Sequence, residues 1–316
     1  MLRVLLVAAP SIGARRRPTV LIVGAASRDV DSTDPRGWRL GGGVSYGAVA
    51  LARLGVRTRA LIGVDDRAAS ARELEYLRRE GIDVRLHRLS AGPVFDNRRL
   101  PGGGRVQHAH GVAEAIPAEE LPREWASSDA AVLSPVAGEL EDDWAEGLPG
   151  EMIVALGWQG LLRLLRPGER VTALPISPRP LIGRADLNVV SAEDAVAGGR
   201  PLAELLSRPG QQLVVTNGPR SAVWFSRERE GFSVRLLPVR PASQPIDETG
   251  AGDVLLAAWV AGVAAARLGG QRKAKVSRGA ELSVAVTAAS LHVENEGIDG
   301  VPDLGAICRR LLTRPG

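Results

Sequence analysis

This chain of 316 residues contains one cysteine, Cys308, and two lysines, Lys273 and Lys275. A single thiol excludes an internal disulfide framework and a cysteine-based zinc cluster, and it indicates a reducing, cytoplasmic compartment. Aromatic residues make up 3% of the chain, too few for a surface that stacks single-stranded nucleic acid. The net charge is only +4 and no basic run is longer than Arg15–Arg17. We therefore expect no nucleic-acid partner, although the pI is about 9.9.

A membrane-spanning helix needs roughly 20 apolar residues, and the apolar segment near the N-terminus is far shorter. The apolar segment Val4–Ala9 is short, and the arginines that follow it make it a weak signal peptide. We therefore expect no membrane partner, and we interpret residues 1–18 as an extension ahead of a folded domain that spans residues 19–316.

Several enzyme motifs are also missing. A Walker A loop needs a lysine after its glycines, and both lysines lie outside any such loop. The H-R-D and D-F-G sequences of protein kinases are absent. No complete G-x-G-x-x-G is present, so a dinucleotide-dependent dehydrogenase is not expected.

The hydrophobic pattern predicts a doubly wound α/β fold. Thr19–Gly24 is an apolar run that ends at a glycine, as buried parallel strands do. Helical patterns alternate with further strands, which favours a mainly parallel sheet with helices on both faces. The expected strands are Arg57–Val64, a third one from Gly81, Ala130–Leu133, Met152–Leu156, Leu187–Val190 and Leu213–Thr216, with an antiparallel edge at Ala222–Phe225 and Val234–Val239. The expected helices are Gly47–Leu54, Ala68–Glu80, Val254–Leu268 and Ala280–Glu294.

Residues 86–110 interrupt this alternation. Val94–Arg98 and Arg105–His110 flank the turn Pro101–Gly104, which predicts a β-hairpin. We interpret it as a small β lid over a cleft, together with residues 31–40. Arg98 and Arg105 could contact a ligand there or stay solvated. His108 and His110 alternate on one strand without a third ligand, so a metal site is not expected.

Residues Asp247–Asp253 carry the most specific pattern in the chain. Gly250 and Gly252 form a small-residue turn before a long apolar helix, whose N-terminus attracts anions. Asp253 enters the first helical turn beside the anion-binding amides. An ordinary N-capped helix after a glycine turn would have a similar sequence. The run Asp247-Glu-Thr-Gly-Ala-Gly-Asp253 nevertheless resembles the D-T-x-G-A-G-D signature of the ribokinase (PfkB) family of carbohydrate kinases.

The segment Gly41–Gly55 supports this resemblance. Its glycines precede a helix of small residues, as in the N-terminal signature of the family, where a Gly-Gly pair contacts the sugar. The resemblance implies that Gly41, Gly42 and Gly43 bind the substrate, although close helix packing alone could require them. Tyr46 stands where many members have asparagine. Asp29 follows the first strand at the sheet edge where ligands bind, and Asp31 is the alternative.

Other positions match the family less closely. Thr216 and Gly218 correspond to the T-x-G that helps to bind nucleotide phosphate, and Ser191–Asp194 replaces the N-x-x-E that influences magnesium. We therefore name Asp194 as the candidate metal ligand. The resemblance also implies nucleotide contacts, and the candidates are Thr249, Ala288 and Ala289. Ala288 and Ala289 could equally be packing residues.

The resemblance implies an enzyme that uses ATP and Mg²⁺ to phosphorylate a hydroxyl group, with a homodimer as one expected assembly. Asp253 would act as general base, and the amides of Gly250, Ala251 and Gly252 would hold the transferring phosphoryl group. The glycine-rich segment resembles members that act on inositol. A polyol, a ketohexose and a nucleoside all remain open as acceptors, with Trp38 and Tyr46 as candidates to stack on a base. A sensor protein on the same fold is the non-enzymatic alternative.

Overall fold

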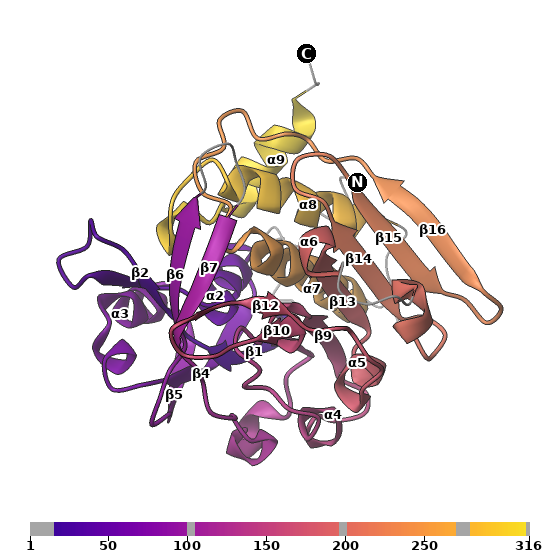
Figure 1. Ribbon diagram of the computed structural model, residues 1–316. Coiled ribbons are helices and arrows are strands. Elements are labelled where there is room, and N and C mark those ends of the chain that lie inside the picture. Colours follow the sequence, from indigo (N-terminus) through magenta and orange to yellow (C-terminus); the bar gives the residue numbers. More distant parts are fainter. Residues whose placement is uncertain (1–15, 100–104, 196–200, 270–278, 314–316) are drawn as a thin grey trace.

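The structure, a computed structural model, describes residues 16–99, 105–195, 201–269 and 279–313. Most of the predicted extension at 1–18 and the glycine turn at 101–104 lie outside these ranges. Within them, nine strands form the central sheet, in the order β16-β15-β14-β13-β9-β8-β1-β4-β5 (Figure 1). These strands are β1 Thr19–Ala25, β4 Arg57–Val64, β5 Asp83–Arg88, β8 Ala130–Leu133, β9 Ile153–Gly157, β13 Leu187–Ser191, β14 Gln212–Thr216, β15 Ala222–Arg227 and β16 Phe232–Leu237.

The pairings from β14 to β5 are all parallel, and β15 and β16 add an antiparallel edge. The described helices are α2 Gly43–Arg53, α3 Arg72–Arg79, α4 Trp144–Gly147, α5 Pro180–Arg184, α6 Ala192–Ala195, α7 Ala251–Leu268, α8 Ala280–His292 and α9 Leu304–Leu312. The short 3₁₀ turns are η1 Ala68–Ser70, η2 Ala118–Glu120, η3 Arg123–Trp125, η4 Gln159–Leu162, η5 Leu202–Leu205 and η6 Ile298–Gly300. The predicted α/β class, with a mainly parallel sheet, is confirmed.

Successive residues of β1 face two different hydrophobic cores. Val20 and Ile22 contribute to the core under α2, α7 and α8, and Leu21 and Val23 contribute to the core under α4 and α5. All four side chains are fully buried. This burial on both faces explains why the strand is apolar throughout rather than alternating with polar residues.

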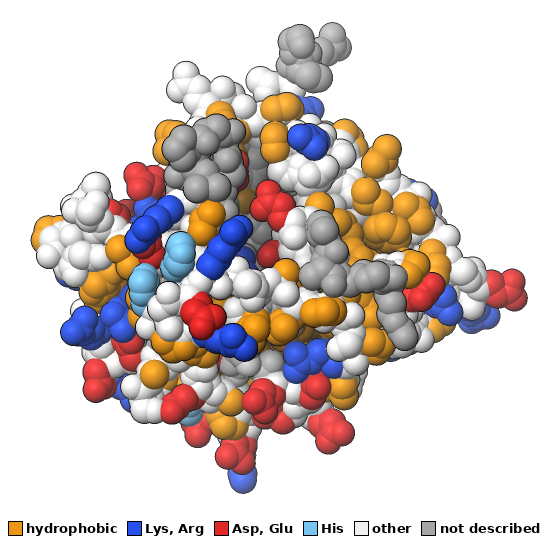
Figure 2. All heavy atoms as spheres, viewed as in Figure 1, with side chains coloured by type: hydrophobic (Ala, Val, Ile, Leu, Met, Phe, Trp, Pro, Cys, Tyr) orange, Lys and Arg blue, Asp and Glu red, His pale blue; other side chains and the backbone are white. Residues whose placement is uncertain are grey.

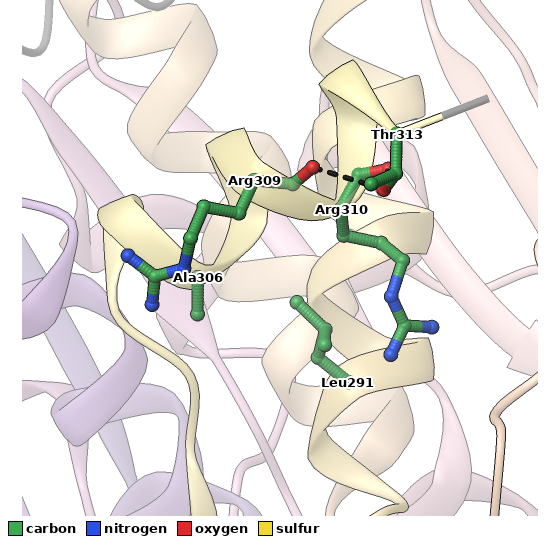
Figure 3. A pocket seen from close by; sticks show the side chains of 5 residues that line it. All are labelled: Leu291, Ala306, Arg309, Arg310 and Thr313. Atoms are coloured by element: carbon green, nitrogen blue, oxygen red, sulfur yellow. Dashed lines mark hydrogen bonds between the residues drawn. The ribbon is translucent and has the colours of Figure 1, made fainter.

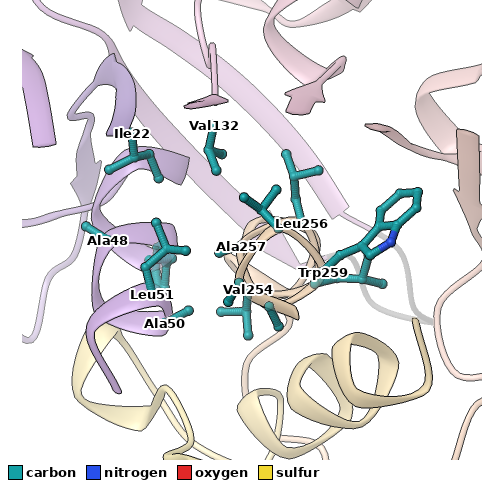
Figure 4. Close-up of a cluster of buried hydrophobic side chains, with 14 of the residues drawn as sticks. Ile22, Ala48, Ala50, Leu51, Val132, Val254, Leu256, Ala257 and Trp259 are labelled. Carbon is teal, nitrogen blue, oxygen red and sulfur yellow. The ribbon is translucent and has the colours of Figure 1, made fainter. Parts of the chain in front are cut away.

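Helix α7 lies in the centre of the first core, packed against α2, α8 and the strands β8, β9 and β13 (Figure 4). Ala257 faces Gly47 of α2, where a Cβ atom would come within 2.6 Å of Ile22. Gly47 therefore permits α2 to approach the sheet closely. Helix α7 is long and apolar enough to cross a membrane, but its position between the sheet and α8 accounts for that composition.

A second sheet of five strands stands beside α7, with the order β11-β7-β6-β2-β3 (Figure 1). These strands are β2 Arg28–Val30, β3 Trp38–Leu40, β6 Val94–Arg99, β7 Arg105–Gly111 and β11 Glu169–Arg170, and a separate ribbon pairs β10 Arg163–Leu164 with β12 Thr172–Ala173. The hairpin expected from the sequence is the antiparallel pair β6–β7. We call this five-stranded sheet the lid sheet.

Three boundaries differ from the sequence-based expectation. Helix α2 begins at Gly43, so the glycine-rich segment forms its N-cap and first turn. The helix expected at 68–80 divides at Ala71, which is extended, because the Asp65 carboxylate caps a separate turn at the Ala68 amide. Residues 86–88 belong to β5 of the central sheet, because they continue the parallel pairing with β4.

Candidate active site

The N-terminus of α7 is an open, anion-attracting end of a buried helix. Gly250 is its N-cap, with φ at +82°, and α7 runs from Ala251. Gly252 is exposed, and a Cβ atom there would meet nothing within 4 Å. The first-turn amides of a helix have no partner within the helix, so the Gly252 amide is available to an anion. The Ala251 amide, which was also expected to face an anion, donates to the Glu248 carbonyl at 3.2 Å.

The turn before α7 is held from several sides. Thr249 donates its amide to Asp247 Oδ1 at 3.0 Å, and its carbonyl lies 2.8 Å from His292 Nε2 on α8. Tyr46 is 1% exposed and lies under Gly250, where a Cβ atom would come within 2.4 Å of its ring. The Tyr46 and His292 rings meet edge to face. Tyr46 and Thr249, both predicted ligand contacts, therefore shape the turn itself.

Asp253 lies where the first turn of α7 meets α2 and the end of β8. Ser134, directly after β8, donates its hydroxyl to Asp253 Oδ1 at 2.6 Å. The Asp253 side chain keeps some exposure, yet burial raises its pKa, and Ser134 and the nearby Arg163 charge oppose that rise. A Cβ atom on Gly43 would lie 2.1 Å from Asp253 Oδ1. Gly43 therefore leaves room for this carboxylate.

Asp29 lies at the other end of the same glycine run. A Cβ atom on Gly41 would come within 2.3 Å of Asp29 Oδ2, so this glycine also makes room for a carboxylate. Asp29 is 6% exposed, and it accepts a hydrogen bond from the Ser27 hydroxyl at 2.9 Å. It lies beyond the carboxyl end of β1, as expected, on β2 of the lid sheet, where it pairs with Phe95 and Arg39. The alternative, Asp31, caps Thr33 in the next turn.

The face of the lid sheet that carries Asp29 also carries an amide pair. Strand register places Asn97 and Gln107 on the same face as Phe95 and Ala109, both of which are buried. Gln107 Nε2 donates to Asn97 Oδ1 at 2.8 Å. Carboxylate and amide groups together offer both acceptors and donors to a ligand under the lid sheet.

Arg39 joins the lid sheet to the turn before α7. It donates to Asp247 Oδ2 at 3.0 Å and to Glu296 Oε1 at 2.7 Å. Burial by itself would raise the pKa of Asp247, but the hydrogen bonds from Thr249 and the charge of Arg39 outweigh it and lower that pKa. The Asp247 carboxylate therefore stays ionised and fixes the turn to the lid sheet.

The candidate nucleotide residues lie at the carboxyl ends of β13 and β14. Ser191 and Thr216 are paired in register, and Gly218 follows with φ at +53° and no neighbour near its missing Cβ. Ser191 donates to Asp194 Oδ2 at 2.7 Å, and Asp194 Oδ1 lies 3.8 Å from Arg163. These residues share one edge of the sheet with the N-terminus of α7, as expected for an open α/β fold.

The two predicted nucleotide contacts on α8 differ in exposure. Ala288 is fully buried in the core, which leaves Ala289 as the partly exposed member of the predicted pair. No group of three or more metal-ligating side chains occurs in the part of the chain that is described. His108 and His110 lie on the opposite face of the lid sheet from Asn97, and His110 and Arg98 both contact Asp96 there. Figure 2 shows histidine side chains next to Lys or Arg side chains on the face in view.

Residues Gly43–Gly47 also spell G-x-S-x-G, the pattern of a hydrolase nucleophile elbow. Ser45 is fully buried in α2 and donates to the Gly41 carbonyl at 3.1 Å. A nucleophile must be exposed at a strand-to-helix turn, so this serine is structural.

The site lies apart from a surface hollow of about 340 Å³ between α8 and α9 (Figure 3). Leu291, Ala306, Arg309, Arg310 and Thr313 line that hollow. Arg310 is already paired with Glu294 at 2.7 Å. None of the lining residues belongs to the predicted site.

Comparison with known proteins gives a consistent result. Residues 183–301 match the pfkB family of carbohydrate kinases. A pyrophosphate-dependent kinase of the ribokinase family, solved with a pyrophosphate analogue and myo-inositol, is 19% identical with a TM-score of 0.67, over 89% of this chain and 98% of that one. A nucleoside kinase from Methanocaldococcus jannaschii is 17% identical, with a TM-score of 0.66 over 95% and 99% of the two chains. Arabidopsis thaliana ribokinase, solved with ribose and ATP, is 18% identical, with a TM-score of 0.64 over 95% and 100%.

No sequence among the curated proteins matches the chain. The resemblance to the ribokinase family is confirmed by the family match and by the shared fold. Sequence reasoning did not identify Ser134, Arg39, Arg163 or His292 as site residues. Only Ser134 carried a usable signal, because it directly follows a buried strand at the edge where ligands bind.

Proposed function

We propose that this protein transfers the terminal phosphoryl group of ATP to a hydroxyl of a neutral polyol or sugar. The premises are that residues 183–301 match the pfkB family of carbohydrate kinases and that most of the chain shares the ribokinase fold. The observation that carries the proposal is the position of Asp253. This carboxylate lies in the first turn of α7, hydrogen-bonded to Ser134 and directly over Gly43.

The reaction follows from these groups. The acceptor hydroxyl oxygen attacks the terminal phosphorus of the donor, and its proton passes to the Asp253 carboxylate. The bond from phosphorus to the bridging oxygen breaks, and its electron pair leaves with ADP. The first-turn amide of Gly252 and the positive end of α7 stabilise the charge on the transferring group. Burial raises the pKa of Asp253 from its ordinary value, which makes this carboxylate a better proton acceptor.

Magnesium fits this site only in part. The described residues hold no group of three or more metal-ligating side chains, and Mg²⁺ is often bound by one or two carboxylates together with substrate phosphates and water. Asp194 is the carboxylate best placed to act in this way, directly after β13. The ion would neutralise negative charge on the donor phosphates.

The acceptor class follows from the lid sheet. Asp29 and the Asn97–Gln107 pair share one face, and their donors and acceptors suit the hydroxyl groups of a polyol. The two aromatic residues considered for stacking on a base are engaged elsewhere. Tyr46 lies under Gly250, and Trp38 lies within 4.5 Å of the Arg36 guanidinium. We therefore favour a polyol or sugar over a nucleoside. The ribokinase-family neighbour solved with myo-inositol supports this choice.

The test is a turnover assay with a panel of inositols, sugars and nucleosides, using ATP or pyrophosphate as donor. Asp253→Asn keeps the side-chain size and removes the proton acceptor, so we expect a loss of about 10²–10⁴-fold in kcat. Asp66→Asn, at a fully exposed side chain, is the matched control and should leave turnover unchanged. Near-normal turnover by Asp253→Asn would refute the general base. Ligand binding without turnover on any acceptor would favour the sensor alternative.

A further inference from the structure

Arg163 is a partly buried cation next to the proposed reaction centre. It is the first residue of β10, pairs with Ala173, and has a side chain that is only 13% exposed. The turn η4 leads into it from β9. Gly160 in that turn donates its amide to the Pro135 carbonyl at 3.0 Å. The element that carries Arg163 is therefore anchored to the residue that follows Ser134.

Asp194 lies near this guanidinium, and the charge of Arg163 also acts on Asp253. Asp194 Oδ1 lies 3.8 Å from Arg163 Nη2, a separation longer than a hydrogen bond. The charge of Arg163 also lowers the pKa of Asp253, against the larger effect of burial. Asp194 follows β13 and Asp253 lies in the first turn of α7, so Arg163 acts on both the candidate metal ligand and the candidate base.

We propose that the Arg163 guanidinium binds the terminal phosphoryl group of the donor and stabilises the charge that develops on it during transfer. The proposal rests on the proposed kinase function and deepens its donor site. An arginine presents a planar fork of donors that matches phosphate oxygens, and it stays charged at every working pH.

Phosphate and carboxylate compete for this cation in a simple way. Without donor, Asp194 is one partner of the Arg163 charge, at 3.8 Å. With donor bound, oxygens of the terminal phosphoryl group make hydrogen bonds to the guanidinium, which are shorter and stronger than this ion pair. The acceptor proton still goes to Asp253 and the electron pair of the broken bond still leaves with ADP, so Arg163 itself is neither protonated nor deprotonated.

The test measures nucleotide affinity by titration calorimetry at constant ionic strength, with ATP, AMP and pyrophosphate as probes. We expect Arg163→Gln to weaken ATP binding about 10- to 100-fold, the range for a lost hydrogen bond to a charged group, and to change AMP binding less than about twofold. Arg163→Lys keeps the charge but not the planar fork of donors, so its ATP affinity should lie between those of wild type and Arg163→Gln. Arg166→Gln removes an exposed charge three residues away and is the matched control.

The outcomes separate the two proposals. If wild type and Arg163→Gln bind ATP or pyrophosphate equally well, the role of Arg163 is overturned and the kinase proposal stays intact. Equal weakening of ATP and AMP would show a structural role and would also overturn it. Wild-type protein that binds neither ATP nor pyrophosphate would refute the donor site, and both proposals with it.

Discussion

Gly250 allows a quantitative test of how the turn before α7 is built. Its φ is +82°, and a Cβ atom would lie 2.4–2.7 Å from three ring atoms of Tyr46. A left-handed backbone costs a non-glycine residue about 1–2 kcal/mol, and forcing a buried ring aside costs about 1–3 kcal/mol. Gly250→Ala should therefore lower the free energy of unfolding by about 2–5 kcal/mol.

A double-mutant cycle separates the two contributions. In a Tyr46→Ala background the ring is gone, so Gly250→Ala should cost only the backbone part, about 1–2 kcal/mol. Gly218→Ala provides a control, because Gly218 also has a positive φ, of +53°, but has no neighbour within 4 Å. Gly252→Ala provides the opposite control, because its position is open and its backbone is helical.

The assay is urea unfolding monitored by far-ultraviolet circular dichroism. The dependence of the unfolding free energy on urea concentration is compared between variants. A cost for Gly250→Ala that is the same with and without the Tyr46 ring would refute the steric argument. A cost no larger than that of Gly252→Ala would refute the left-handed turn as well.

Two further predictions concern charged groups of the site. Ser134→Ala removes the 2.6 Å hydrogen bond that opposes the burial-driven rise in the pKa of Asp253, so the acidic limb of the pH–rate profile should move to higher pH; an unmoved limb would exclude Ser134 as the partner of the base. Asp247→Asn removes a carboxylate whose pKa is lowered in the folded state. Such a carboxylate contributes stability that is fully present above the unfolded pKa of about 3.9 and is lost as pH falls through the folded pKa. The variant should thus be less stable by about 1–3 kcal/mol at pH 7 and should approach wild type in acid unfolding experiments, and a pH-independent difference would contradict the ion pair with Arg39.

The sequence predicted the strands of the central sheet closely, because these strands are buried on both faces and their apolar runs are unbroken. Elements that depend on distant partners were harder to predict. β2 and β11 have only three and two residues, too few to show a period, and they are strands because β3, β6 and β7 pair with them. The helix expected at 68–80 divided because a side chain outside it, that of Asp65, capped an earlier turn.

Local sequence carried the pattern from which the proposed site at the N-terminus of α7 was inferred. Gly250, Gly252 and Asp253 are near neighbours in the sequence, so they could be named as candidates without coordinates, and the structure places them in the N-cap and first turn of α7. The tertiary structure alone decided what surrounds them. Ser134, Arg163 and Arg39 come from three other parts of the chain, and side-chain contacts across such separations leave no periodic or local signal in a sequence.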